Sequence, residues 1–216
     1  EYVYVELVYN QNFNKPNFTE IQNISKWCEC YQKTNVYRSL SIWKDRTKNE
    51  ALSGPFVIDI DNEYQDLDDA LIVTRNAIKC IERLYELEEN DIRLFFTGHK
   101  GFNIEISPEA LGLSCMQSID YNAADRISRK IISELKRHAD MSDQIESGEG
   151  YELYPTLNKV SEQNTVIDRI HDYVRLHDSV NKWIENYKEQ SRRKIELTMS
   201  EINSLSLTQI IDRSIE

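Results

Sequence analysis

The segment Pro55–Asp61 is a short apolar run that contains two aspartates one residue apart, Asp59 and Asp61. Because side chains alternate between the two faces of a β-strand, a strand here turns both carboxylates to one face while Ile58 and Ile60 face a core. Two like charges on a half-buried strand are costly unless a cation or a basic group stands between them. The segment therefore predicts a buried strand whose acidic face holds a divalent metal ion.

A D-x-D pair is common in proteins, and a solvated strand end is its ordinary alternative. The pair lies at the C-terminal end of an apolar strand, where sheet proteins often bind ligands, and this position favours a metal site over a solvated strand end. Alternate residues of a strand lie roughly 6.5 Å apart, so two carboxylates can clasp one or two hard cations. Oxygen-only ligation suits Mg²⁺ or Mn²⁺.

Length and composition allow one sizeable domain or two small lobes, since the chain has 216 residues, of which 40% are hydrophobic and 29% charged. No apolar run approaches the roughly 18 residues of a membrane helix, and the N-terminus lacks a targeting pattern. We therefore expect a cytoplasmic protein with no membrane partner. The chain begins with Glu1 and not with Met, so we expect it to be one piece of a longer protein whose other domains are partners. The four cysteines make no zinc pattern and are expected to be reduced thiols.

The formal net charge of −11 argues against broad electrostatic adhesion to nucleic acid, because nonspecific binders usually carry a basic surplus. An acidic protein can still carry a local basic groove, and metal ions neutralise part of an acidic site. The charge thus weighs against a nucleic-acid partner without excluding one.

Helical and strand patterns alternate along the chain, which predicts an α+β or α/β fold. A strand or an arm is expected over residues 2–9, and residues 139–163, rich in polar residues with two glycines and a proline, are expected to form a long loop. The other expected strands are 36–43, 55–61, 93–96, 102–106, 165–168, 173–177 and 194–197. The expected helices are 19–34, 66–87, 121–138 and two short ones capped by Thr198 with Glu201 and by Ser206 with Gln209.

Two further segments could contact phosphates. The turn Thr97–Gly101 is bracketed by glycines that let backbone N–H groups approach an anion, and it carries Lys100; an ordinary tight turn is the alternative. After Asp168, a strand followed by polar residues offers donors suited to a triphosphate, and surface ion pairing is the alternative there. These donors are Arg175, Ser179, Asn181 and Lys182.

The order and spacing of these segments resemble the archaeo-eukaryotic primase superfamily, which includes the primase-polymerases. The resemblance covers residues 35–212: an apolar strand ending in D-x-D, a helix, a hairpin of the form small-Gly-x-Lys-Gly-aromatic, and a later acid followed by Arg-Leu-x-x-Ser-x-Asn-Lys. Tyr37-Arg38-Ser39 is similar to a strand that precedes the first motif in the family. The chain is short and rich in helices, and in this it is similar to members of the family encoded near CRISPR adaptation genes. A prokaryotic or viral origin is therefore expected.

The resemblance implies a single catalytic domain over residues 1–216, with an N-terminal α/β lobe interleaved with an RRM-like sheet lobe and the active site in the cleft between them. It implies a DNA-directed primase or polymerase that uses two Mg²⁺ or Mn²⁺ ions, a DNA template and primer, and dNTP or NTP substrates. The implied catalytic metal ligands are Asp59, Asp61 and Asp168. The implied nucleotide-binding residues are Arg38, Thr97, His99, Lys100, Asn103, Arg175, Ser179, Asn181 and Lys182.

The chain departs from the family at Asn103, where the second motif has a histidine that touches the phosphates of the nucleotide. Asparagine can donate a hydrogen bond but carries no positive charge. Either Asn103 fills the role with weaker electrostatics, or His99 compensates, or the domain binds nucleotides and catalyses poorly. Two other functions therefore stay open: a nucleotide- or nucleic-acid-binding module derived from a primase, and a metal-dependent nuclease, although the four histidines lack the spacing of nuclease ligands.

Overall fold

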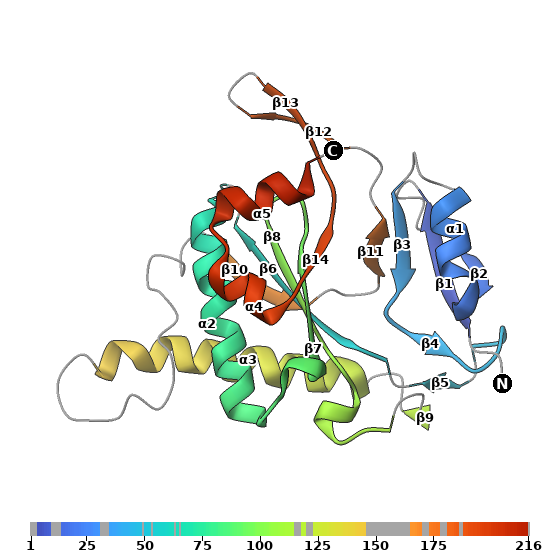
Figure 1. Ribbon diagram of the computed structural model, residues 1–216. Helices are drawn as coiled ribbons and strands as arrows, with labels where there is room; N and C mark the ends of the chain where they lie inside the picture. The colour runs from blue at the N-terminus through green and yellow to red at the C-terminus, as the bar shows by residue number, and fades with distance from the viewer. Residues whose placement is uncertain are drawn as a thin grey trace.

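The computed structural model describes residues 4–9, 14–30, 35–48, 50–52, 54–62, 64, 66–114, 118–119, 123–145, 165–169, 173–177, 181–185 and 188–215. These residues form a mixed α+β structure with two antiparallel sheets and a few helices (Figure 1), which confirms the expected α+β class.

The first sheet, sheet A, has the strand order β11-β3-β1-β4-β5-β9, with β2 paired to β1. Its strands are β1 (Tyr4–Tyr9), β2 (Asn17–Glu20), β3 (Val36–Ser39), β4 (Ile42–Trp43), β5 (Ala51–Leu52), β9 (Ser118–Ile119) and β11 (Tyr173–His177). The short helix α1 (Ile24–Cys30) packs on one face, where its side chains join a small core built around Val5, Leu7 and Val36.

The second sheet, sheet B, has the order β10-β6-β8-β7-β14, and its neighbouring strands are antiparallel. Its strands are β6 (Phe56–Asn62), β7 (Ile92–Phe96), β8 (Gly101–Ile106), β10 (Thr165–Arg169) and β14 (Ile195–Leu197). The helices that accompany it are α2 (Leu67–Tyr85), α3 (Ala123–Ile145), α4 (Met199–Ser204) and α5 (Leu207–Ser214). Along the chain, the first six of these elements follow the order β6-α2-β7-β8-α3-β10, a β-α-β-β-α-β unit.

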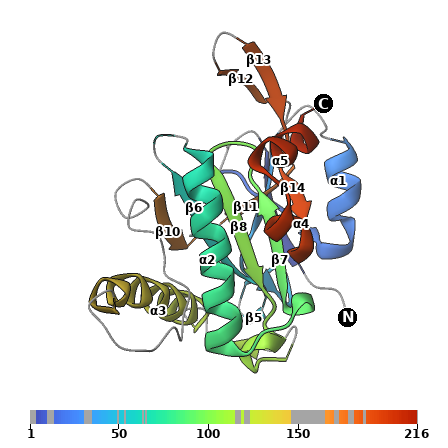
Figure 2. The same cartoon turned by 60° about the vertical axis from the view of Figure 1, so that its left-hand side comes forward.

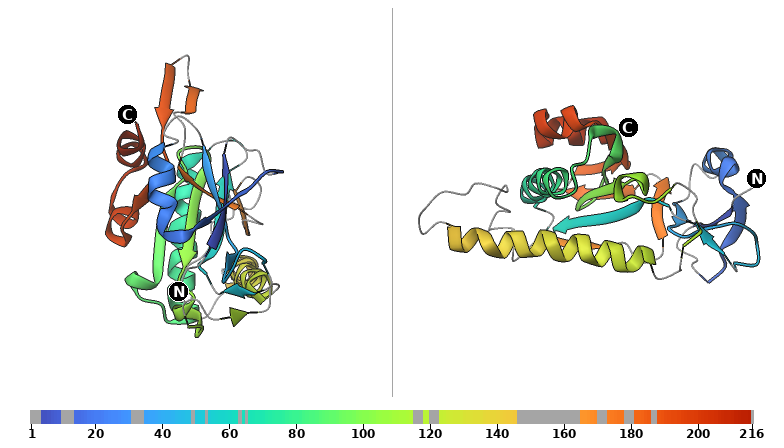
Figure 3. Two further views of the ribbon diagram at one scale, coloured as in Figure 1. Left: turned by 90° about the vertical axis from the view of Figure 1, so that its right-hand side faces the viewer. Right: turned by 90° about the horizontal axis from the view of Figure 1, so that it is seen from below.

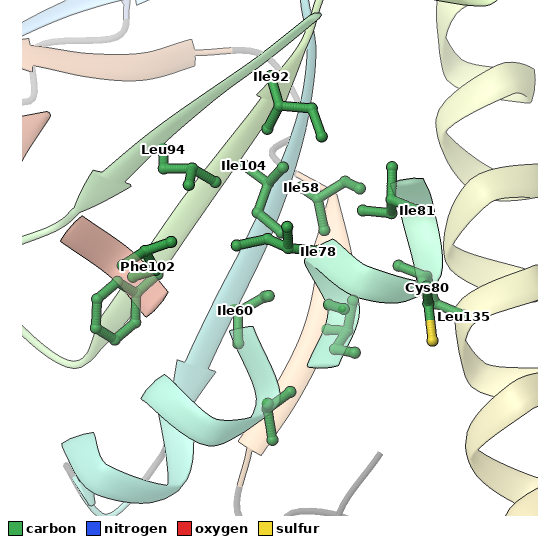
Figure 4. Packing of buried hydrophobic residues seen from close by; sticks show 14 of the residues in the cluster. Ile58, Ile60, Ile78, Cys80, Ile81, Ile92, Leu94, Phe102, Ile104 and Leu135 are labelled. Atoms are coloured by element: carbon green, nitrogen blue, oxygen red, sulfur yellow. The ribbon is translucent and has the colours of Figure 1, made fainter. Parts of the chain in front are cut away.

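The main core lies between sheet B and its helices, and Figure 2 shows α2 crossing in front of the sheet. Alternate residues of β6 and β8, such as Ile58, Ile60 and Ile104, are fully buried against α2 and α3 (Figure 4). The intervening residues of β6, Asp59 and Asp61, are only partly buried. The alternation predicted from the sequence therefore turns the two aspartates away from this core, as expected.

Two further strands and three 3₁₀ turns complete the described elements. β12 (Asn181–Glu185) and β13 (Lys188–Arg192) pair with each other as a separate hairpin, which projects from the body of the protein in Figures 1 and 3. The 3₁₀ turns are Ile21–Asn23, Glu89–Asp91 and Glu109–Leu111.

Several boundaries follow local signals that the sequence carries. Asp66 caps α2 by accepting a hydrogen bond from the Asp69 N–H at 3.1 Å. Glu86, directly after the last helical residue Tyr85, adopts left-handed backbone angles. The two short C-terminal helices have the predicted capping boxes, Thr198 with Glu201 and Ser206 with Gln209.

Three predictions of local structure are wrong. The helix expected over residues 19–34 begins only at Ile24, because Thr19 belongs to β2 and its hydroxyl accepts a hydrogen bond from Trp27 instead of capping a helix. The strand expected over 36–43 is broken into β3 and β4 by a bend. The loop expected over 139–163 begins later, since α3 continues to Ile145; its remaining residues, 146–163, lie outside the described part.

Candidate active site

A row of cross-strand partners runs across sheet B from β10 to β14. Asp168 is the partner of Asp59, Asp59 of Asn103, Asn103 of Phe95, and Phe95 of Glu196. Directly opposite residues of antiparallel strands occupy the same face of a sheet. Segments more than one hundred residues apart in the chain are thereby brought to one register position on the face opposite the core.

The two aspartates of β6 each have a polar partner from the β7–β8 hairpin. The Asn103 amide donates to Asp59 Oδ1 at 2.6 Å, and the Lys100 ammonium lies 2.9 Å from Asp61 Oδ2. Asn103 is 4% exposed, so its hydrogen bond to Asp59 is shielded from solvent. The hairpin thus supplies one neutral donor and one positive charge to the acid pair.

Gly101 is required where β8 meets β6. A Cβ atom at this position would lie 1.8 Å from the Ile60 carbonyl oxygen and 2.7 Å from Asp61 Oδ1. The absence of a side chain lets the hairpin approach the acid pair closely.

The carboxyl group of Asp59 has a strongly raised pKa. Burial, together with the neighbouring Asp61 carboxylate, raises its pKa from 3.8 to about 7, against the opposing effects of Lys100, Asn103 and Lys194. The positive charges of Lys100 and Lys194 therefore do not fully neutralise the two carboxylates. A pair of carboxylates that still lacks neutralising positive charge suits a bound cation.

The metal-free protein should lose stability as the pH rises from about 4 to about 7. Because the pKa of Asp59 is higher in the folded protein than in the unfolded chain, the folded state holds an extra proton in this window, and the free energy of unfolding falls as that proton is lost. Above pH 7 the full cost is present, about 4 kcal/mol for a pKa raised from 3.8 to about 7. Urea unfolding at pH 5 and pH 8 measures the part of this cost that develops between those pH values, about 3 kcal/mol. In Asp59→Asn this part of the pH dependence should vanish, and equal slopes for the two proteins would contradict the assignment.

The turn between β7 and β8 is closed by Thr97, whose backbone N–H and hydroxyl both donate to the Gly101 carbonyl, at 3.0 and 2.9 Å. The buried Thr97 hydroxyl is thus engaged within the turn, where it also accepts a weaker bond from the His99 N–H at 3.4 Å. Gly98 has a φ of +75°, and its Cβ position would lie 2.9 Å from the Arg193 carbonyl oxygen. The turn therefore packs against the backbone that leads into β14.

Lys194, which the sequence analysis did not single out, lies beside this site. Its ammonium is 4.5 Å from the centre of the Phe95 ring, and its charge lowers the pKa of both Asp59 and Glu196. The signal was present in the sequence, since Lys194 and Glu196 alternate with the apolar Ile195 and Leu197 of a predicted strand.

Beyond Phe95 the same face carries an ion-pair cluster. Arg93 donates to Glu196 at 2.8 and 3.0 Å and lies 3.6 Å from Glu105. Arg38, on β3 of sheet A, is 8% exposed, and its burial lowers the pKa of its guanidinium group. The negative charge of Glu105 raises this pKa, and the positive charge of Arg93 lowers it. Arg38 is therefore within electrostatic range of sheet B, where the two sheets approach each other.

Three of the remaining predicted nucleotide-binding residues lie on strands outside sheet B. The register of β11 pairs Val174 with Arg38 and Arg175 with Tyr37. Asn181 and Lys182 belong to β12 in the projecting hairpin, and Ser179 lies outside the described residues. The part of these residues in nucleotide binding stays a prediction.

Among the residues that the structure describes, no group of three or more His, Cys, Asp or Glu could hold a metal ion. Asp59 and Asp61 supply the oxygen donors that Mg²⁺ and Mn²⁺ prefer, and the raised pKa of Asp59 supports the fit. The backbone register places Asp168 next to them, and its part as third ligand is a prediction.

Comparison of the chain with protein-family models gives no match, and a search of curated proteins gives none either. Among the helices in the described ranges, none is long and apolar enough to cross a membrane.

Proposed function

We propose that this chain is the catalytic domain of a primase-polymerase, which joins nucleotides on a DNA template by a two-metal mechanism. The observation that carries the proposal is the row on sheet B, where Asp168, Asp59 and Asn103 occupy neighbouring register positions. The three motifs of the resembled superfamily predict this convergence, although they lie far apart in the sequence.

The topology of sheet B supports the same proposal. A β-α-β-β-α-β unit with the sheet order β10-β6-β8-β7 is the split βαβ arrangement, which RRM domains share. Sheet A with α1 would then be the N-terminal lobe, and the Arg38 side of β3 would face the nucleotide.

The outward positions of the two central strands argue against a simple binding module. RNA-binding RRM domains place aromatic side chains there, on which bases stack. Here those positions carry Val57, Asp59 and Asp61 on β6 and Gly101, Asn103 and Glu105 on β8. The three carboxylates repel a phosphate backbone unless cations intervene, which favours a metal-dependent reaction over passive binding of nucleic acid.

Asp59 and Asp61, with Asp168, would hold the two ions. When bound, such ions lower the pKa of a 3′-hydroxyl group and stabilise the charge on the pyrophosphate that leaves. Asn103 orients the Asp59 carboxylate through its 2.6 Å hydrogen bond. No nucleophilic side chain is needed, because the attacking group belongs to the primer and the protein contributes positioning and electrostatic stabilisation.

Lys100 and Lys194 would neutralise the triphosphate. Lys100 is tied to Asp61 by one ion pair, and Lys194 rests on the Phe95 ring within electrostatic range of Asp59. Both ammonium groups stand on flexible stems that let the charge turn toward a phosphate.

Primer extension with dNTP or NTP and Mn²⁺ tests the proposal. Lengthening of a labelled primer supports a polymerase, whereas shortening supports the nuclease alternative. Binding of nucleotide without either product would support the binding module, for which the asparagine at position 103 is the motivating observation.

Lys194→Gln should raise the KM for the nucleotide about tenfold or more while kcat changes little. A hydrogen bond to a charged group contributes about 1.5–3 kcal/mol, and this one would be lost from the bound nucleotide. Steady-state extension kinetics measure the two constants. Lys44→Gln is the matched control, since Lys44 pairs with Glu50 near sheet A, and its KM should stay at the wild-type value. Equal constants for the wild type and Lys194→Gln would remove Lys194 from the nucleotide site.

A further inference from the structure

Asn62, the last residue of β6, is fully buried and directly follows Asp61. Its backbone N–H donates to the carbonyl of Lys100 at 2.9 Å, in the turn between β7 and β8. Its side-chain oxygen accepts the backbone N–H groups of Tyr64 and Asp66, each at 2.9 Å. These two bonds fix which way the amide points.

The amide nitrogen of Asn62 points toward the start of β10. It donates to Thr165 Oγ1 at 2.9 Å and to Asp69 Oδ2 at 3.3 Å. The Thr165 hydroxyl in turn donates to the same Asp69 oxygen. Because an asparagine amide has two donor hydrogens and an oxygen with two acceptor sites, the hydrogen-bonding capacity of Asn62 is fully used.

These bonds join three segments that are distant in sequence. Thr165 begins β10 and lies 103 residues from Asn62, while Asp69 lies in the first turn of α2. All three side chains are buried, with exposures of 0%, 7% and 7% for Asn62, Asp69 and Thr165. Breaking any of these bonds would leave a buried polar group without its partner, so the network favours a single arrangement of the three segments.

β10 is the edge strand of sheet B and pairs only with β6 among the described strands. Thr165 is the partner of Asn62, and Asp168, three residues later, is the partner of Asp59. A slip of two residues would keep the same face outward but would carry Asp168 about 7 Å along β6. An edge strand has no second neighbour to prevent such a slip.

We propose that Asn62, Asp69 and Thr165 are positioning residues that fix the register of β10, and so hold Asp168 opposite Asp59. The inference rests on the proposed function for the role of Asp168 as a metal ligand; the control of register does not. Through its bond to the Lys100 carbonyl, Asn62 also ties the β7–β8 turn to the same point.

Metal binding tests the first half of the proposal. Thr165→Val keeps the shape of the side chain but removes the hydroxyl, and this variant should bind Mn²⁺ at least about tenfold more weakly than the wild type in calorimetry. Thr165→Ser keeps the hydroxyl and should bind Mn²⁺ with an affinity close to that of the wild type. Thr74→Val is the matched control, because Thr74 is 1% exposed and donates to the Ala70 carbonyl within α2, with no bond to β10. Asn62→Ser is a second probe and should resemble Thr165→Val. Equal Mn²⁺ affinity in the wild type and Thr165→Val, or an equal loss in Thr74→Val, would overturn the proposal.

A cross-link tests the register without reference to function. In the double variant D59C/D168C a disulfide should form on mild oxidation, because opposite residues of antiparallel strands have Cα atoms about 4.5–5.5 Å apart. D59C/V166C, displaced by two residues, should form little. Adding Thr165→Val should reduce the 59–168 bridge, as read by peptide mass mapping, and an unchanged yield would overturn the register claim. If the wild type binds no Mn²⁺ while the cross-links behave as expected, the proposed function fails and the register claim stands.

Discussion

Asp59→Asn should abolish metal-dependent nucleotide incorporation, lowering kcat by at least about a thousandfold, the scale on which removing one strong electrostatic contributor acts. Asparagine keeps the size of the side chain but supplies no negative charge, so the acid pair that would hold the ions becomes a single acid. The same substitution should also abolish the rise in melting temperature that Mn²⁺ gives the wild type at pH 8, because a ligand stabilises only the protein that binds it. Primer extension and thermal unfolding with and without Mn²⁺ measure the two effects.

The control for Asp59→Asn is Asp68→Asn, since Asp68 is exposed in the first turn of α2 and carries the same charge. It should keep both the activity and the response to Mn²⁺. Activity that survives in Asp59→Asn would contradict the two-metal proposal. Loss of activity with an unchanged thermal response to Mn²⁺ would place the metal elsewhere.

Gly101→Ala should destabilise the protein by at least about 3 kcal/mol, at the upper end of what overpacking costs. The added Cβ would meet the Ile60 carbonyl oxygen at 1.8 Å, and this neighbour is backbone that cannot turn aside. β8 must therefore move away from β6, which also separates Asn103 from Asp59. Denaturant unfolding measures the loss of stability.

Gly54→Ala serves as the control for the glycine prediction. Its added Cβ would meet Ile42 Cδ1 at 2.9 Å, at the end of a side chain that can change rotamer. We expect a change below about 1 kcal/mol there. A similarly small change in Gly101→Ala would show that the two strands can separate at little cost.

Strand alternation was sufficient to predict which face of sheet B carries the two aspartates and Asn103. The apolar run around Asp59 and the alternation in β8 placed the two aspartates and Asn103 away from the core, as the structure shows. The helix caps at Asp66, Thr198 and Ser206 are local chemistry, in which a side chain bonds to the backbone three residues later, so the sequence carries them directly.

Sequence patterns were insufficient where tertiary contacts decide the local structure or the arrangement of distant strands. Thr19 has the pattern of a capping residue, but its hydroxyl bonds to Trp27 and its backbone pairs with β1. The placement of Lys194 and Arg38 depends on how β14 and β3 approach the row on sheet B, which no local pattern encodes. The register that pairs Arg175 with Tyr37 joins strands that lie 134 residues or more apart, and periodicity says nothing about register between distant strands.

The chain passes repeatedly between the two sheets: β5 and β9 belong to sheet A, β6, β7 and β8 to sheet B, and β11 returns to sheet A after β10. A cut between β5 and β6 would leave all described strands of sheet B in the C-terminal fragment, but it would separate β9 and β11 from the rest of sheet A and expose unpaired edges. Sheet A therefore cannot be obtained by a single truncation. For protein engineering, the two sheets are best kept in one chain.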